Sequence, residues 1–290
     1  MKLGAVIITM GNRPDDLNAL IESVARQDGE PVEVVVVGNG APVRGVPGWV
    51  RTVDLPENLG IPGGRNVGIE AFGPGGTDVD ALLFLDDDGL LANKDTAELV
   101  RQAFAADPAL GIVSFRIADP DTGETQRRHV PRLRASDPMR SSRVTTFLGG
   151  ANAVRTKVFA EVGGLPDEFF YAHEETDLAW RALDAGWMID YRSDMVLLHP
   201  TTAPSRHAVY HRMVARNRVW LARRNLPVPL VPVYLGVWLL LTLLRRPSGA
   251  ALKAWFGGFR EGWTTPCGPR RPMKWRTVWR LTRLGRPPVI

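Results

Sequence analysis

Three consecutive carboxylates, Asp86, Asp87 and Asp88, follow directly on a short apolar run over residues 81–85. Such a run is typical of a buried strand that ends at a turn, and α/β sheets bind ligands at the carboxyl ends of their strands. Adjacent like charges repel, and hard oxygen ligands favour Mg²⁺ or Mn²⁺. We therefore expect a divalent ion that carries phosphate, although an acidic loop after a strand has the same pattern.

A second acidic group, Glu174, Glu175 and Asp177, stands at the predicted start of a helix over residues 174–185. Glu174 and Asp177 are three positions apart and share one helix face. A helix N-terminus favours carboxylates, so stabilisation of the helix end is the simplest explanation. A carboxylate at this position is also suited to act as the base that removes the proton from an attacking hydroxyl.

A glycine-rich stretch over residues 60–68 contains Gly63, Gly64, Arg65 and Asn66. Glycines permit close backbone approach to a ligand. Arg65 is suited to bind a diphosphate or a sugar. Asn66 is suited to form a hydrogen bond with the backbone at the helix start. The stretch is not a Walker loop, because no Gly-Lys-Ser/Thr follows it.

The segments around these motifs alternate between strand-like and helix-like patterns. Strands are predicted over 3–9, 32–37, 50–55, 81–85 and 110–115, and helices over 14–27, 62–72 and 93–106. This alternation predicts an α/β fold with a mostly parallel sheet and helices on both faces. Residues 117–145 break the pattern with many arginines. We expect a solvated loop, or else a mobile lid or a segment that binds an acceptor substrate.

The charge of the chain is divided unevenly. Residues 206–290 hold 17 Lys and Arg but only one acid, Glu261, whereas residues 1–205 hold 19 basic and 30 acidic residues. The net charges are thus +16 and −11, which predicts two units, 1–205 and 206–290. Six of the nine tryptophans also lie after residue 206, and basic residues mixed with tryptophan suit an anionic membrane surface.

An uncharged stretch over residues 226–244 favours lipid over nucleic acid as the partner of this basic segment. It could just span a bilayer, but Pro227, Pro229 and Pro232 crowd its beginning, and spanning would oppose the positive-inside rule. We expect helices that lie in or dip into the cytoplasmic leaflet, with a spanning helix or a soluble packing helix as alternatives. The single cysteine, Cys267, excludes a disulfide framework and fits a reducing compartment.

The glycine-rich stretch, the acidic tripeptide and the segment over residues 163–181, together with residues 7–14, resemble the family-2 inverting glycosyltransferases of the GT-A fold. The resemblance covers roughly residues 3 to 200. It implies a Rossmann-like sheet and the transfer of a sugar from a nucleotide diphosphate sugar to an acceptor hydroxyl. Rhamnose and galactofuranose are the sugars it suggests.

The resemblance also implies roles for the acidic tripeptide. Asp88 binds the metal, Asp86 lies near the metal or the ribose, and Asp87 takes part in binding the donor. His199 is implied as a further metal ligand, with a strand-end histidine as the alternative. The metal is Mg²⁺ or Mn²⁺ and stabilises the departing diphosphate.

In the second acidic group the resemblance implies that the second acid is the base. That position is Glu175 here, where the family usually has aspartate, so Asp177 and Glu174 stay as alternates.

The nucleotide is implied to sit at the end of the first strand, near Thr9, Asn12 and Arg13. After the second strand Asn39 matches the family, but Gly38 and Ala41 replace the usual Asp and Ser. Uridine, thymidine and guanosine donors therefore all remain open.

We expect a GT-A domain with a C-terminal membrane-associating segment, acting at the cytoplasmic face of the cell membrane. Its expected partners are a nucleotide diphosphate sugar, a glycan or lipid-linked glycan of the cell envelope, and the membrane surface, but no nucleic acid. A nucleotidyltransferase and a non-catalytic membrane scaffold are the alternatives.

Overall fold

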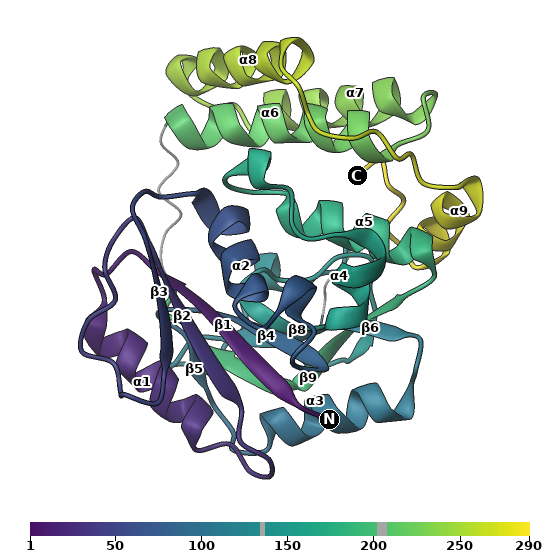
Figure 1. The fold of residues 1–290 in the computed structure, drawn as a ribbon. Coiled ribbons are helices and arrows are strands. Elements are labelled where there is room, and N and C mark those ends of the chain that lie inside the picture. The colour runs from purple at the N-terminus through teal and green to yellow at the C-terminus, as the bar shows by residue number, and fades with distance from the viewer. Residues whose placement is uncertain (134–136, 202–207) are drawn as a thin grey trace.

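The computed structural model describes residues 1–133, 137–201 and 208–290. Its centre is one mixed sheet in the order β3-β2-β1-β4-β8-β6-β9-β5, with β7 paired to β9 (Figure 1). The strands are β1 (Leu3–Thr9), β2 (Glu33–Asn39), β3 (Arg51–Leu55), β4 (Ala81–Asp86), β5 (Leu90–Leu91), β6 (Leu110–Ala118), β7 (Ser142–Arg143), β8 (Ala151–Arg155) and β9 (Met188–Leu198).

The first half of the sheet is parallel, as predicted. β1 pairs in parallel with β2 and β4, and β2 with β3. In this register Thr9 lies opposite Gly38, and Ile8 lies opposite Asp86. The polar residues that end these strands therefore meet at one edge of the sheet.

The second half of the sheet contains antiparallel strands, which the sequence did not indicate: the two-residue strands β5 and β7 both run antiparallel to β9, and β8 reverses direction between β4 and β6. β8 runs antiparallel to both β4 and β6, with Ala151 opposite Leu85. The start of β8 consequently lies at the carboxyl end of β4. This brings Gly149 and Gly150, which precede β8, to the acidic tripeptide.

Helices cover both faces of the sheet (Figure 1). They are α1 (Pro14–Ala25), α2 (Gly60–Glu70), α3 (Thr96–Ala106), α4 (Thr156–Val162), α5 (Glu174–Ala185), α6 (Ala208–Asn225), α7 (Leu230–Leu244), α8 (Gly249–Thr264) and α9 (Trp275–Arg283), with short 3₁₀ turns η1 (Pro74–Gly76), η2 (Arg127–His129) and η3 (Asp167–Phe169). One buried apolar cluster joins the sheet to α1 and α3. The other joins it to α2, α4 and α5.

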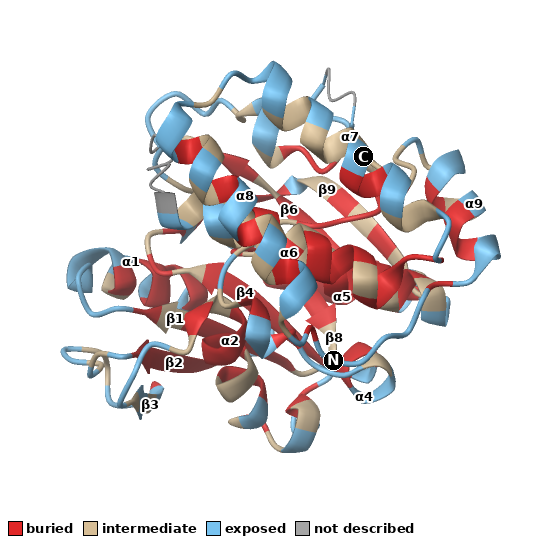
Figure 2. Ribbon diagram, turned by 90° about the horizontal axis from the view of Figure 1, so that it is seen from above, coloured by how far each residue is buried: buried red, intermediate tan, exposed pale blue. Residues whose placement is uncertain are grey.

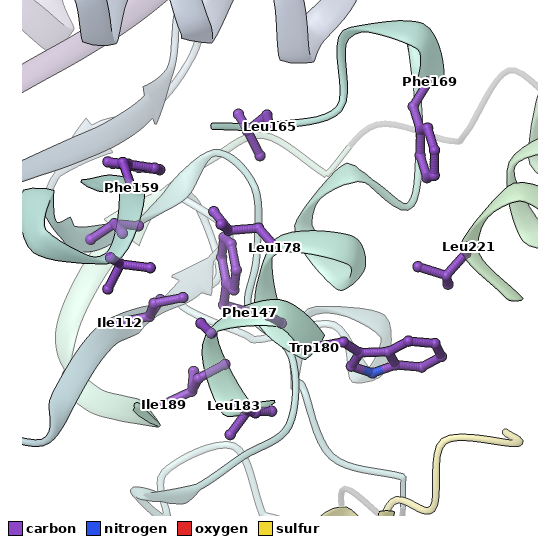
Figure 3. Packing of buried hydrophobic residues seen from close by; sticks show 14 of the residues in the cluster. Ile112, Phe147, Phe159, Leu165, Phe169, Leu178, Trp180, Leu183, Ile189 and Leu221 are labelled. Carbon is purple, nitrogen blue, oxygen red and sulfur yellow. The ribbon is translucent and has the colours of Figure 1, made fainter. Parts of the chain in front are cut away.

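The C-terminal helices extend this second cluster. Trp180 of α5 and Leu221 of α6 belong to it, and Figure 3 shows them close to Phe169 of η3. Helix α5 is largely buried beneath α6 and α7, whereas much of α8 faces solvent (Figure 2). The predicted division between residues 205 and 206 falls outside the described residues. On its two sides the described helices share one apolar core.

The uncharged stretch contains α7, a helix of 15 residues. Across the described ranges, no helix combines the length and the apolar character that crossing a membrane requires.

Candidate active site

Asp87 links the acidic tripeptide to residues at and after the end of β1. Its carboxylate accepts a hydrogen bond of 2.6 Å from the buried Thr9 hydroxyl and faces Arg13 at 3.3 Å. Burial raises the pKa of Asp87, while the Thr9 hydrogen bond and the Arg13 charge oppose that rise. Asp87 thus ties the end of β4 to the end of β1.

Asp88 and His199 form a pair at the same sheet edge. The Nε2 atom of His199 lies 3.0 Å from Asp88 Oδ1, and Arg13 contacts Asp88 Oδ2 at 2.5 Å. Burial alone would raise the pKa of Asp88, but the His199 hydrogen bond and the charges of His199 and Arg13 outweigh it and lower that pKa. The same hydrogen bond raises the pKa of His199.

The spacing of this pair fits two ligands of a divalent ion. Neighbouring ligands of an octahedral ion at about 2.1 Å lie roughly 3.0 Å apart, which is the separation of Asp88 Oδ1 and His199 Nε2. Within the described ranges, no group of three His, Cys, Asp or Glu side chains is arranged to hold a metal. Oxygens of a bound ligand and water would therefore complete the coordination of an ion at Asp88 and His199.

Asp86 lines the same cavity as that pair but has a different partner. Its Oδ1 atom contacts the buried Arg65 guanidinium at 3.2 Å. A Cβ atom on Gly150 would lie 1.9 Å from the Asp86 carboxyl carbon, so only glycine leaves room for this carboxylate. Asp86 therefore belongs to an Arg65 cluster in this structure rather than to the Asp88–His199 pair.

Arg65 connects Asp86 to Glu175. A Cβ atom on Gly149 would lie 2.1 Å from Glu175 Oε1 and 2.9 Å from Arg65 Nη1, so these two side chains converge on the same glycine. Burial raises the pKa of Glu175, and the Arg65 charge opposes that rise. Glu175 is thus a carboxylate with increased basicity beside the acidic tripeptide.

Glu174 and Asp177 have different surroundings. Glu174 is buried, its Oε2 atom has no hydrogen-bond partner among the described residues, and burial followed by the Glu175 charge raises its pKa well above the usual value. Asp177 is fully buried and binds Arg181 at 2.8 Å and Arg224 at 3.0 Å. The structure therefore places Asp177 in an ion-pair network between α5 and α6, not beside Asp86.

Asn39, Gly63 and Gly64 make contacts that position the glycine-rich stretch beside the site. The Asn39 amide donates to Gly60 O at 2.9 Å and accepts from Leu59 N at 2.8 Å. A Cβ atom on Gly63 would lie 2.7 Å from Leu59 Cβ, which excludes a larger residue there. A Cβ atom on Gly64 would lie 3.2 Å from the Asn39 amide nitrogen, a tight contact. These contacts fix the glycine-rich stretch, which forms α2.

A cavity of about 440 Å³, which we call the donor cavity, lies at this edge. It brings together eight of the predicted residues, Thr9, Asn12, Arg13, Asn39, Asp86, Asp87, Asp88 and His199. Its lining also includes Asn58, Phe170 and Tyr171, which sequence reasoning missed. For Phe170 and Tyr171 the sequence did offer a signal, because two adjacent aromatic residues stand just before the helix that begins at Glu174.

The loop that carries this aromatic pair has an unusual backbone. Phe170, Ala172 and His173 have φ angles of 61°, 69° and 74°, a region that costs about 1–3 kcal/mol for each non-glycine residue. The buried Asn217 amide of α6 donates to the carbonyls of Phe169, Tyr171 and Ala172 at 2.7–2.9 Å. We call residues 169–173 the strained loop, and Asn217 satisfies the carbonyls that its conformation turns inward.

Comparison with known proteins agrees with this geometry. Residues 5–163 match the family model described as Glycosyl transferase family 2. The Pre-mycofactocin glycosyltransferase of Mycobacterium tuberculosis strain H37Rv is 26% identical over 232 residues, which cover 76% of this chain. This chain spans 44% of the length of that curated relative.

Solved structures share the fold at low identity. Staphylococcus aureus TarS 1-349 in complex with UDP-GlcNAc has a TM-score of 0.62 and 14% identity, covering 90% of this chain and 80% of that one. GalNAc-T7 with UDP, GalNAc and Mn²⁺ has a TM-score of 0.64 and 14% identity, covering 92% and 52%. The mannosyltransferase PcManGT of Pyrobaculum calidifontis with GDP-Man and Mn²⁺ has a TM-score of 0.58 and 17% identity, covering 98% and 84%.

The Asn217→Leu variant tests the role of α6 in the site. It keeps the side-chain size but leaves buried carbonyls of the strained loop without donors, so we expect a loss of about 2–4 kcal/mol in the free energy of unfolding. Urea denaturation measures this loss. The matched control is Asn18→Leu, at a partly exposed position of α1, which should change stability by less than about 0.5 kcal/mol. Equal stability of the two variants would show that Asn217 does not hold the loop.

Proposed function

Because the chain belongs to glycosyl transferase family 2, we propose that it transfers one sugar from a nucleotide diphosphate sugar to an acceptor hydroxyl with inversion at the anomeric carbon. The observation that carries the proposal is the donor cavity, whose edge holds three carboxylates, Arg13 and His199, with Glu175 linked to it through Arg65. For the sugar we propose rhamnose or galactofuranose, which rests on the resemblance of the motifs alone.

For the donor, we propose that Asp88 and His199 hold a divalent ion. When bound, Mg²⁺ or Mn²⁺ would neutralise charge that gathers on the departing diphosphate. Arg13 lies 2.5 Å from Asp88 and would supply a further positive charge beside the phosphates. Phe170 and Tyr171 line the same cavity and offer flat surfaces for the nucleoside.

For the acceptor hydroxyl, we propose Glu175 as the base. Its raised pKa makes it a stronger proton acceptor than an exposed glutamate. Arg65 lies between Glu175 and Asp86 and keeps both carboxylates in place without drawing either from the site. Glu174 is the fully buried neighbour, and the burial that raises its pKa suits it to hold a proton rather than to remove one.

We further propose that the chain acts at the cytoplasmic face of the cell membrane on a lipid-linked glycan of the cell envelope. The support is a set of exposed apolar side chains on the C-terminal helices and on the turn before α7, all with at least 46% of their surface accessible: Val228, Val233, Leu240, Leu243, Leu244, Phe256, Trp263, Trp275 and Trp279. We call this set the apolar C-terminal surface. Exposed basic residues adjoin this set in the chain, among them Arg245, Arg246 and Arg276, and would favour anionic lipid.

The Asp88→Ala variant tests the metal-dependent transfer. Loss of one of two protein ligands should abolish sugar transfer and also the Mn²⁺-dependent thermal stabilisation by nucleoside diphosphates. Sugar transfer is followed by release of the nucleotide from a panel of donors, and stabilisation by a melting scan. Asp121→Ala, in an exposed loop, is the control and should behave like the unaltered protein. Full transfer in excess EDTA would contradict a metal at this site.

The Glu175→Gln variant tests the base. We expect kcat to fall by about 10² to 10⁴-fold while nucleotide affinity stays nearly constant. The base must be deprotonated and burial raises the pKa of Glu175 above its ordinary value of 4.5, so activity should be present above that raised pKa and lost as pH falls through it. The acidic limb of the kcat profile measures this. A larger loss in Glu174→Gln than in Glu175→Gln would exchange the two roles.

Flotation with liposomes tests membrane attachment. Full-length protein should rise with anionic vesicles, and 1 M salt should weaken attachment without abolishing it, because apolar insertion is not screened. The double variant Leu240→Glu, Leu244→Glu should float less well, whereas Leu133→Glu, an exposed leucine outside the C-terminal helices, should float normally. Protein that stays at the bottom of the gradient with anionic vesicles would rule out this attachment.

A further inference from the structure

A second cavity of about 60 Å³ lies between α5, α6, α7 and the last residues of the chain. It shares no lining residue with the donor cavity. Arg218, Arg286, His173 and Tyr234 line it, together with Trp238 and Thr146. We call it the cationic cavity. The C-terminal end of the chain, drawn in yellow, passes below α7 to close it (Figure 1).

Its two arginines differ from the other partly buried arginines of the protein. Arg65 pairs with Asp86 and Arg224 with Asp177. Within the described residues, the Arg218 guanidinium has only a long hydrogen bond, 3.5 Å, to the Tyr234 hydroxyl and a face-on contact with the Trp238 ring. For the Arg286 guanidinium no ion pair or hydrogen bond to the described residues is found.

The cavity also holds a polar atom without a partner. His173 Nε2 is buried and unpaired among the described residues. Burial, with the charges of Arg218 and Arg286, lowers the pKa of His173 well below its usual value, so the ring is neutral near pH 7. Two guanidinium groups and a free imidazole nitrogen thus line one small space. Arg218 and Arg286 are half-buried, and cations with limited access to water attract counter-charges. This arrangement therefore suits an anion from outside the chain.

Size and position narrow the choice of anion. A space of about 60 Å³ holds roughly four water molecules on the measure that gives one water 10–15 Å³, which suits a single phosphate group. Paired guanidiniums are the groups that bind phosphate oxygens most strongly. The aromatic rings of Trp238 and Tyr234 provide apolar walls beside them.

The cationic cavity also lies next to the proposed base. Thr176, which follows Glu175 directly, lines this cavity. The strained loop separates the two cavities, since Phe170 and Tyr171 line the donor cavity and His173 the cationic one. The cationic cavity thus lies against the first turn of α5, the turn that carries Glu175.

We propose that the cationic cavity binds the phosphate of an isoprenoid-phosphate-linked acceptor and so directs the acceptor hydroxyl toward Glu175. The inference rests on the proposed glycosyltransferase function and names the chemical class of its acceptor. Arg218 and Arg286 are the binding residues, and His173 donates or accepts one hydrogen bond according to its tautomer. The chain segment that carries Arg286 completes the site.

Isothermal titration of the full chain in EDTA tests this proposal, with farnesyl phosphate as the probe and farnesol and inorganic phosphate as comparisons. Farnesyl phosphate should bind at least tenfold more tightly than either. Arg286→Gln should weaken its binding about tenfold or more, because a charged hydrogen-bond donor is lost. Arg286→Lys keeps the charge and should recover part of the affinity. Arg283→Gln, which removes an exposed arginine three positions away, should have no effect.

Measurement of nucleotide binding distinguishes a failure of the cationic-cavity proposal from a failure of the proposed glycosyltransferase function. In Arg286→Gln the Mn²⁺-dependent binding of nucleoside diphosphates should match the unaltered protein, which also shows that the variant is folded. Undiminished farnesyl phosphate binding by that variant would overturn the cationic cavity as the acceptor site. Inorganic phosphate that binds as tightly as farnesyl phosphate would identify a free-phosphate site and overturn the lipid acceptor. An unaltered protein that binds no nucleotide would instead refute the proposed function.

Discussion

One buried amide group, that of Asn217, constrains the whole arrangement around the strained loop. Its two hydrogens are shared among three carbonyls of residues 169–173. That loop supplies Phe170 and Tyr171 to the donor cavity and His173 to the cationic cavity. It leads directly into α5, which carries Glu175. Because its backbone is unfavourable by itself, the position of all these groups depends on α6 being docked.

Much of the parallel half of the fold followed from the sequence, because strands that end in Thr9, Asn39 and Asp86 each have an uninterrupted apolar run before a polar residue. The meeting of these residues at one edge is a direct consequence of parallel pairing. The reversal of β8 was not predictable in this way, because its five residues have no pattern that gives direction. Gly149 and Gly150 reach the site only through that reversal, so their role appeared with the structure.

The role of Asp177 and of the C-terminal arginines was also hidden, for a physical reason. Local patterns place Asp177 on α5 but cannot show that Arg224, 47 residues later, reaches back to it. The composition suggested a surface rich in positive charge. Several of those arginines instead donate inward to carbonyls at helix ends, as Arg223 does to Thr265 O and Arg280 to Trp187 O. The segment over residues 208–290 is therefore partly an internal scaffold as well as a charged exterior.

The Asp177–Arg224 ion pair has a consequence for the order in which the chain becomes native during synthesis. Asp177 leaves the ribosome 47 residues before its partner, a delay of roughly 2–10 s at about 5–20 residues per second. Arg181 of the same helix can pair with Oδ2 of Asp177 at once, but Oδ1 has its partners only when Arg224 and Asn225 of α6 have been made. Burial of Asp177 is therefore completed only when α6 docks. Strands β1 to β4 can pair early, whereas α5 becomes fully packed only after α6 has left the ribosome. In that interval the nascent chain is most open to chaperones and proteases.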